Sequence, residues 1–378
     1  MPEISCKKWS YAVLCFVTSG VGAVVLINML VDTYGILRTD FTKQFQEPNQ
    51  KYVKMKYLLG HRDKYDSFLF GSSRALQIDT KRMQNGVYYN MAYSEGLPQE
   101  HLDNIKFLLA NNVRIRNLMI ALDDFSYLVD PRRHLSDLLR QPHYLVSGKK
   151  PSFFYGEYFL KIKRFIPSIR SYLRHNYTEQ GRTAVRKTAY DFYDSGRVLC
   201  TTCDAEIEGD VEKHVRDKKF ETPFHYEGDN IGKTLDAMRE LVALAREHDI
   251  NLTVFINPIH RTTYLDTNLS QFFAFKKELA GITDYYDFSG LNAITTSNYY
   301  YHETSHYREM VGDMMLKRMF GSPSVSASPV FGVRVTRRNV DGHLLALREQ
   351  IRGVTPGPTV MVSVPKTTTQ RRVGGTEL

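Results

Sequence analysis

The feature that most constrains this chain is a long run without formal charge near its start. Residues 9–31 contain no Asp, Glu, Lys or Arg, and Lys8 and Asp32 bound the run. As a helix rising about 1.5 Å per residue, the run spans roughly 34 Å, which is enough to cross a hydrocarbon core of about 30 Å. We therefore expect a transmembrane anchor over residues 9–31 and a cytoplasmic tail over residues 1–8.

Two other interpretations of this run fit less well. A cleaved secretion signal has a shorter apolar region and a cleavage site of small residues, which the end of this run lacks. A buried helix of a soluble protein is disfavoured, because the rest of the chain is hydrophilic and supplies no second run of this kind. The numbers of basic residues on the two sides of the run are nearly equal, so the positive-inside rule does not decide the orientation of the helix. We expect the short N-terminal tail to stay in the cytoplasm. Residues 32–378 are then expected outside.

Composition narrows the class of protein. The chain has 378 residues, of which 42% are hydrophobic and 24% charged, so it can bury a full core. Its formal charge is +9, but 41 acidic residues lie among 50 basic ones, which indicates diffuse basicity and no nucleic-acid partner. A polyanionic partner stays open. The four cysteines exclude a cysteine-rich scaffold, and Cys200 and Cys203 are the candidate pair.

Alternating strand and helix patterns follow the apolar run. Strands are predicted over residues 67–70, 87–90, 117–122 and 252–256, and helices over residues 98–111 and after Asp229, which is positioned to cap one. Strands that alternate with helices predict a mostly parallel sheet covered on both faces. The expected fold is a three-layer α/β/α domain over residues 32–320.

Two segments depart from this pattern. Residues 131–225 are basic and aromatic without clear periodicity, and we interpret them as an insertion over one end of the sheet. At that position the insertion is expected to form a lid or a substrate groove. The alternative is a helical excursion that only packs against the domain. Residues 321–378 are expected to comprise a linker over 322–329, a short helix over 339–352 and a disordered tail from 355.

The first candidate for chemistry follows the strand over residues 67–70. Gly71 permits a tight turn, and Ser73 on such a strand-to-helix turn is exposed at the sheet edge beside backbone amides. An ordinary turn and helix cap would have the same sequence. Arg74 is a candidate for binding a carboxylate or sulfate of a substrate, or for pairing with a surface acid.

The next two strands end in further candidates. Asn90 and Gly96 offer a side-chain amide and a backbone amide to the same edge, which suits a developing oxyanion, although a plain Asx turn explains Asn90 equally well. Asp123 follows the strand over residues 117–122. His260, after the strand over residues 252–256, either faces the site or is an inert loop histidine.

A late segment supplies the candidate base. Glu303 lies three residues before His306, so it can fix the tautomer of the imidazole and leave the other nitrogen to accept a proton from a serine. A tyrosine-rich loop that happens to hold two histidines is the plain alternative. A metal site with His302 and His306 is also open, but no third ligand is evident.

Together these segments resemble the SGNH/GDSL hydrolase superfamily, whose blocks occur in this order over residues 65–320. The resemblance is closest to membrane-anchored bacterial members with Gly-Ser-Ser-Arg, which are related to alginate-type O-acetyltransferases and to the D-alanyl transfer protein of teichoic acid synthesis. The supporting segments are Asp32-Thr33-Tyr34-Gly35, Asn257-Pro258-Ile259-His260 and Asp287-Phe288-Ser289-Gly290.

The resemblance implies roles for particular residues. Ser73 matches the nucleophile, His306 the general base and Glu303 the orienting acid, while the Ser73 amide and a group from residues 90–96 would form the oxyanion hole. Glu303 stands where the superfamily usually has Asp. Asp123 stands where an Asn donor is expected, and an ionised carboxylate cannot donate. This departure indicates a missing donor, a different acyl substrate or a degenerate site.

The expected function is therefore acyl transfer or ester hydrolysis on envelope or exported polysaccharide, through an acyl-serine intermediate and without a cofactor or metal. The expected location is a bacterial inner membrane with the domain on the periplasmic or extracellular side. A multispanning membrane acyltransferase is an expected partner. The alternative is an inactive scaffold that binds polysaccharide or such a partner. For Cys200 and Cys203 a disulfide is favoured over a redox or zinc site.

Overall fold

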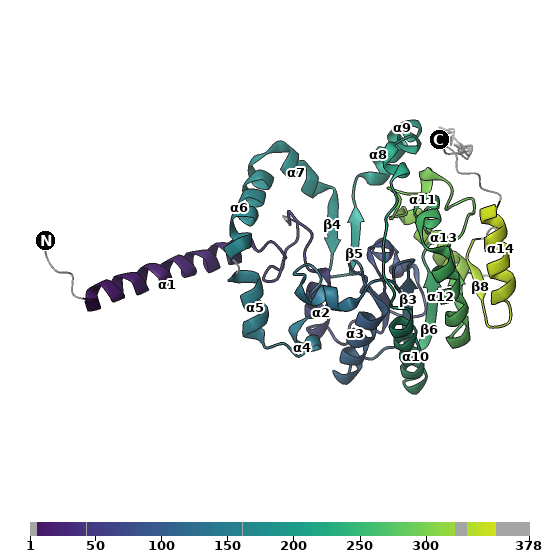
Figure 1. The fold of residues 1–378 in the computed structure, drawn as a ribbon, viewed down its shortest axis with the longest axis horizontal. Coiled ribbons are helices and arrows are strands. Elements are labelled where there is room, and N and C mark those ends of the chain that lie inside the picture. The colour runs from purple at the N-terminus through teal and green to yellow at the C-terminus, as the bar shows by residue number, and fades with distance from the viewer. Residues whose placement is uncertain (1–5, 43, 161, 322–330, 353–378) are drawn as a thin grey trace, which may run out of the picture.

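A long N-terminal helix projects from an α/β body (Figure 1). The computed structural model describes residues 6–42, 44–160, 162–321 and 331–352. Helix α1 (Cys6–Val31) contains the predicted apolar run and is long and apolar enough to cross a membrane, a property that anchors share with signal sequences. The predicted linker over 322–329 and the predicted tail from 355 lie outside the described residues, as does most of the predicted cytoplasmic tail.

The body is built on a six-stranded sheet. The strand order is β2-β1-β3-β6-β7-β8, and every neighbouring pair is parallel except β7 and β8. The strands are β1 (Ser67–Phe70), β2 (Tyr88–Asn90), β3 (Asn117–Leu122), β6 (Asn251–Ile256), β7 (Tyr285–Asp287) and β8 (Val333–Val335). The predicted α/β fold with a mostly parallel sheet is confirmed. The antiparallel edge formed by β8 was not predicted.

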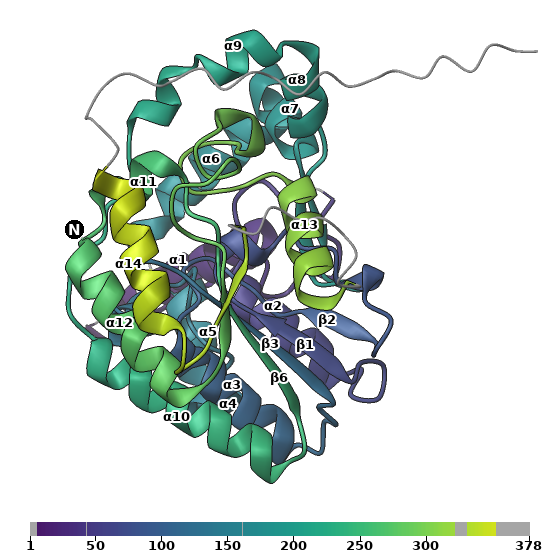
Figure 2. The ribbon, with the colours of Figure 1, turned by 90° about the vertical axis from the view of Figure 1, so that its right-hand side faces the viewer.

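Strand side chains alternate between two apolar layers. Phe68 and Phe70 of β1 join one buried cluster, whereas Leu69 joins the other. Figure 2 shows α3, α10 and α12 on one side of the sheet and α13 on the other. Helices α2 and α14 contribute to the same cluster as α3, α10 and α12. The bounds of these helices are α2 (Gln50–Leu59), α3 (Pro98–Ala110), α10 (Ile231–Glu247), α12 (Leu269–Ile282), α13 (Glu309–Phe320) and α14 (Val340–Arg352).

Sequence periodicity predicted most of these bounds closely. Strands β1 and β3 have the predicted bounds, and α3 ends one residue before the prediction. Helix α10 begins after Asn230 rather than directly after Asp229, although the Asp229 carboxylate still accepts a hydrogen bond from the Ile231 amide at 3.3 Å. The strands that went unpredicted are short or lie at an edge, where apolar runs are weakest.

The chain makes a long excursion between β3 and β6. Its helices and strands are α4 (Tyr144–Ser147), α5 (Pro151–Phe159), α6 (Ile162–Tyr177), α7 (Glu179–Arg186), β4 (Thr188–Asp191), β5 (Arg197–Cys200), α8 (Cys203–Gly209) and α9 (Val211–Val215). Strands β4 and β5 pair as an antiparallel hairpin. The Ser195 carbonyl accepts from the Asn90 amide at 2.8 Å, so this hairpin lies against the carboxyl end of β2.

Aromatic residues of the excursion are largely used for packing. Phe154, Tyr158 and Phe159 are buried in a cluster with Phe41 and Tyr52. The insertion thus has its own apolar contacts with the chain that follows α1.

Candidate active site

Ser73 stands at the carboxyl end of β1. Strand β1 ends at Phe70, and a 3₁₀ turn spans Ser73–Ala75. The turn is capped by Ser72, whose hydroxyl accepts from the Arg74 amide at 3.2 Å. A Cβ at Gly71 would lie 2.7 Å from the Ala121 Cβ, so only glycine allows β1 to turn this close to β3. Ser73 is partly exposed at this edge.

His306 lies on a tight hairpin just before α13. An antiparallel bridge between Tyr301 and Tyr307 closes the hairpin, and Glu303 lies within it. The Glu303 carboxylate accepts from the Ser305 amide at 2.7 Å and from the His306 amide at 2.9 Å. The fold of this turn therefore fixes the carboxylate before the imidazole is considered.

Ser73, His306 and Glu303 form one hydrogen-bonded row. His306 Nε2 lies 2.8 Å from Ser73 Oγ, although the two residues are 233 positions apart in the sequence. His306 Nδ1 is hydrogen-bonded to Glu303 Oε1. The three residues predicted to act together are thus brought into contact at the carboxyl edge of the sheet.

Electrostatics set the roles of the two ring nitrogens. Burial acts to raise the pKa of Glu303, but its hydrogen bond with His306 and the two amides hold that pKa below its usual value. Glu303 is therefore ionised at neutral pH and can only accept hydrogen bonds. Nδ1 of His306 then carries the hydrogen that faces Glu303, and Nε2 is left to accept from the Ser73 hydroxyl.

Arg74 connects the turn that carries Ser73 with the hairpin that carries His306. Its side chain is 1% exposed, and Nη1 contacts Asp123 Oδ1 at 3.1 Å and also Asp124. Nε donates to the Ser305 carbonyl at 3.0 Å, on the hairpin that carries His306. Of the two predicted roles, the structure shows the pairing with acidic residues, and Arg74 Nη2 is buried without a hydrogen-bond partner among the described residues.

Asp123 belongs to the same buried network. Burial raises the pKa of its carboxyl, and the Arg74 guanidinium acts in the opposite direction. Oδ1 of Asp123 accepts from Asn257 Nδ2 at 3.0 Å, and Asn257 Oδ1 accepts from the Tyr307 hydroxyl at 3.0 Å. Asp123 therefore acts as an acceptor that ties β3, β6 and the hairpin together, which accounts for a carboxylate at this position.

The predicted oxyanion donors occupy different roles. Asn90 donates to the Ala75 carbonyl at 2.8 Å and accepts from the Ala92 amide at 2.9 Å, so it is an Asx turn that also holds the serine turn. The Gly96 amide donates to the Tyr93 carbonyl at 3.0 Å. In the described part of the chain the amides of Ser73 and Ser94 donate to no other backbone group.

Two other histidines are structural. His260 is buried, caps α11 (Arg261–Asp266) and contacts the Asn298 side chain at 2.9 Å, and burial lowers its pKa to about 4. His302 Nε2 lies 3.4 Å from Gln77 Oε1, and the His302 amide donates to the His306 carbonyl at 2.8 Å. Among the described residues, no group of three His, Cys, Asp or Glu side chains is arranged to hold a metal ion.

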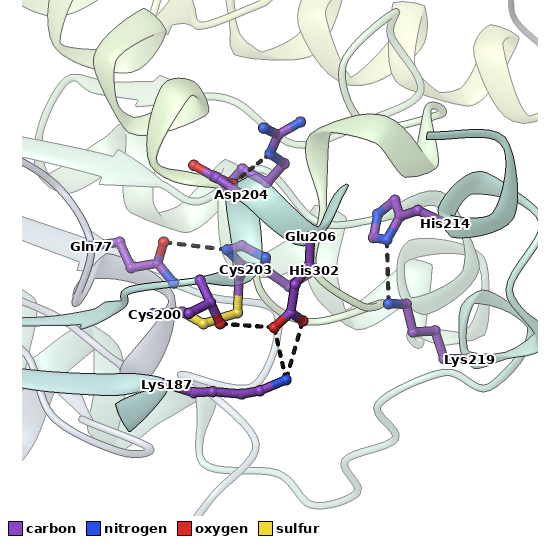
Figure 3. Close-up of a disulfide and its surroundings, with 11 residues drawn as sticks. Gln77, Lys187, Cys200, Cys203, Asp204, Glu206, His214, Lys219 and His302 are labelled. Atoms are coloured by element: carbon purple, nitrogen blue, oxygen red, sulfur yellow. Dashed lines mark hydrogen bonds and ion pairs between the residues drawn. A yellow bond between two sulfur atoms is a disulfide. The ribbon is translucent and has the colours of Figure 1, made fainter. Parts of the chain in front are cut away.

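A disulfide lies at the start of α8, the helix that contacts Arg308 just after the hairpin that carries His306. Figure 3 shows Cys200 and Cys203 joined at the start of α8, with Gln77 and His302 hydrogen-bonded beside them. The favoured prediction for this pair, a simple disulfide, agrees with the structure. Helix α8 presents Asp204 and Glu208, each 2.7 Å from the guanidinium of Arg308, two residues after His306.

Arg308 and Ser94 were not singled out from the sequence. Arg308 is nearly buried, and its partners lie about a hundred positions earlier in a segment without periodicity. The free group of Ser94 is its backbone amide, which leaves no mark on side-chain composition, while its hydroxyl accepts from Arg140 at 3.3 Å. The usable signal for Ser94 was positional, because it lies inside the segment 90–96 from which a donor was expected.

Comparison with known proteins gives no family. No protein-family model matches the sequence, and no curated protein is similar enough to it to indicate shared ancestry.

Proposed function

We propose that this protein is a membrane-anchored serine acyl-transfer enzyme, either an O-acetyltransferase or an acyl esterase, that acts on envelope or exported polysaccharide. The observation that carries the proposal is the row formed by Ser73, His306 and Glu303, with 2.8 Å between Ser73 Oγ and His306 Nε2. Nucleophile, base and orienting acid within hydrogen-bonding reach are what covalent acyl transfer requires.

The chemistry follows from this arrangement. His306 Nε2 takes the hydroxyl proton as Ser73 Oγ attacks the acyl carbonyl, and the amides of Ser73 and Ser94 stabilise the oxyanion. Collapse of the tetrahedral intermediate gives acyl-Ser73, and His306 returns the proton to the leaving oxygen. Water or a sugar hydroxyl then attacks the acyl-enzyme, again with His306 as base, and restores Ser73.

Phe224 is positioned to flank the acyl group. Its ring is 42% exposed and lies 6.4 Å from the His306 ring, edge to face. Phe224 belongs to the carboxyl end of the excursion, and under this proposal that end lines the substrate site while other parts of the excursion pack against the body. An exposed ring beside the base offers an apolar wall to an acyl chain.

The resemblance to anchored SGNH/GDSL members supports the location and the substrate class. Under this proposal α1 is an uncleaved single-pass anchor in a bacterial inner membrane, and residues 32–378 lie on the periplasmic or extracellular side. A multispanning acyltransferase that delivers the acyl group is the proposed partner. The disulfide fits an oxidising compartment.

Hydrolysis of a small acetyl ester tests the proposal. The full chain in detergent should hydrolyse 4-nitrophenyl acetate, and the Ser73→Ala variant should lose at least about a hundredfold in kcat/KM, because covalent catalysis is lost. A fluorophosphonate probe should label the wild type and not the variant. Ser147→Ala, an exposed serine on α4, is the matched control and should behave as wild type.

The second candidate function is an inactive scaffold that binds polysaccharide or a membrane acyltransferase. It is motivated by Asp123, a carboxylate at the position where the superfamily has a donor. If the wild type and Ser73→Ala hydrolyse the ester at the same background rate and neither is labelled, the scaffold replaces the enzyme.

A further inference from the structure

Helix α1 is joined to the body without a free linker. Asn28, on the last two turns of α1, donates from its side chain to the Phe159 carbonyl at 2.8 Å. Asp32 then accepts from the amides of Ile36 at 2.8 Å and Arg38 at 2.9 Å, so its carboxylate organises the turn that ends the helix. The body is therefore held in one orientation relative to the axis of α1.

Helices α5 and α6 lie beside the end of α1 (Figure 1). Residues 6–23 of α1 are exposed along their whole length, and contact with the body begins near Val25. A helix needs about 20 residues to cross a hydrocarbon core. Counted from Trp9, that length reaches Asn28, the residue bonded to α5. Helices α5 and α6 are thus at the level where α1 leaves a membrane.

Helix α6 turns an apolar stripe away from the body. Ile166, Leu173 and Tyr177 have the spacing of a single helix face and are 73%, 48% and 75% exposed. The opposite face carries His175, which is buried and stacks on Phe45 with ring centroids 5.7 Å apart. An amphipathic helix in a soluble protein has the reverse arrangement, with its apolar face against the core.

Helix α5 also exposes apolar side chains, and the stripe of α6 carries positive charge. Phe153 at the start of α5 and Leu160 just after it are 67% and 54% exposed. Arg170 lies on the same face as Ile166 and Leu173, and both Arg170 and Arg174 are exposed. The sequence of α6 contains no acidic residue. Apolar and basic side chains on one exposed face fit a lipid surface with anionic headgroups.

We propose that α5 and α6 rest in the headgroup region of the bilayer that α1 spans. The contact surface, defined by Phe153, Leu160, Ile166, Arg170, Leu173 and Tyr177, buries its apolar groups at the acyl boundary and places its arginine among the headgroups. The body is thereby held upright on the membrane at two points. The inference depends on the anchor part of the proposed function and is independent of any acyl-transfer chemistry.

Quenching by brominated lipid tests this contact in the full-length protein. Trp9 on α1 is the single tryptophan and serves as the positive control in nanodiscs of acyl-brominated phosphatidylglycerol and phosphatidylcholine. In a Trp9→Phe background, the Leu173→Trp variant should be quenched at least about half as strongly as Trp9, because a ring at the acyl boundary meets the bromines. The matched control is Leu345→Trp, on α14, where the native side chain is 59% exposed.

The outcomes separate the two parts of the proposal. Quenching of the Leu173→Trp variant without quenching of Leu345→Trp supports the contact. Equal values at the two positions, high or low, overturn it. An unquenched but blue-shifted Leu173→Trp emission, with a dimer detected by mass photometry, means that a second copy covers the stripe and also overturns it. If the Trp9 control itself is unquenched, α1 is not in the bilayer, and the anchor fails together with this contact.

Discussion

Two arginines hold the two halves of the candidate active site, and they do so in different surroundings. Arg74, beside the nucleophile, is fully buried with Asp123 and Asp124, which are themselves almost inaccessible. Arg308, beside the base, is also nearly buried, but its partners Asp204 and Glu208 have side chains that are 45% and 52% exposed. The turn that carries Ser73 is therefore supported from the core of the sheet, whereas the hairpin that carries His306 is contacted by the same core network at Ser305 and has a second support at the periphery.

The difference predicts where substitutions will cost stability and where they will cost activity. A carboxylate left unpaired in the core cannot be solvated, so removing its partner is expensive. A half-exposed carboxylate is solvated by water when its partner is removed, and the loss is small. Substitutions in the network of Arg74 should therefore mainly lower the free energy of unfolding. Substitutions in the network of Arg308 should mainly change the position of the His306 imidazole.

The largest effect is expected at Arg74. In Arg74→Met the carboxylates of Asp123 and Asp124 stay buried without a cation, and the free energy of unfolding should fall by about 3 to 5 kcal/mol. Urea unfolding of the protein in detergent, followed by near-ultraviolet circular dichroism, measures the loss. Arg352→Met, which removes a 75% exposed side chain paired with Glu349, is the control and should change little. Equal losses in the two variants would remove the distinction between core and periphery.

A second buried ion pair tests whether burial, rather than closeness to the candidate site, determines how much unfolding free energy is lost when a pair is broken. Lys51 and Glu100 are 2.6 Å apart and nearly inaccessible. Burial acts to raise the pKa of Glu100, but Lys51 and His134 outweigh it and lower the pKa to about 2. Because the pKa is depressed in the folded state, the contribution of Glu100 is complete above about pH 4.5 and is lost as the pH falls toward 2.

The expected loss over that range is about 3 kcal/mol, since each pKa unit corresponds to about 1.4 kcal/mol. Glu100→Gln should flatten this part of the profile of unfolding free energy against pH. Glu212→Gln, at a 73% exposed carboxylate on α9, should leave the profile unchanged. A profile of unaltered slope in Glu100→Gln would show that the buried pair contributes nothing specific.

Core and periphery also differ in what the sequence predicts about them. The strands with long apolar runs were predicted within a residue or two, because burial on both faces leaves a local signal. Ser73 and His306 were predicted from a strand-to-turn boundary and from the Glu-x-x-His spacing, both of which are local. The role of Asn90 was left between a donor and an Asx turn. Only the structure shows the turn, in which Asn90 Oδ1 accepts from the Ala92 amide, and shows that Asn90 Nδ2 donates to the Ala75 carbonyl.

The peripheral support was not predicted, for a physical reason. The contacts of Arg308 join positions about a hundred residues apart, and such pairs impose no periodicity on either segment. The same holds for the β4–β5 hairpin, whose residues are only partly buried. The disulfide was predicted as a pair, but nothing in the spacing of Cys200 and Cys203 indicated which helix it would hold.

The disulfide should have an intermediate effect. It closes a loop of four residues, for which the chain-entropy model gives at most about 2 kcal/mol. Replacing Cys200 and Cys203 together by Ser should lower the unfolding free energy by no more than that. Reductant should lower the wild type to the level of the double variant and leave the double variant itself unchanged. A response of the double variant to reductant would mean that another group is the target.

The smallest effect on stability, and the most informative, is expected at Arg308. In Arg308→Gln the carboxylates of Asp204 and Glu208 are solvated, so the unfolding free energy should fall by only about 1 kcal/mol. The hairpin that carries His306 loses its outer support, and a slightly misplaced base should lower kcat about tenfold with KM unchanged. Labelling of Ser73 by the fluorophosphonate should slow by the same factor, which a merely structural role would not produce.

Two further variants sharpen the test. Arg308→Lys keeps a positive charge at this position and should recover part of the lost kcat. Arg216→Gln, which breaks an exposed pair with Glu212 on α9, is the control and should leave kcat at the wild-type value. If Arg308→Gln instead destabilises the protein as much as Arg74→Met, the contacts of Arg308 belong to the core, and the distinction between core and periphery fails.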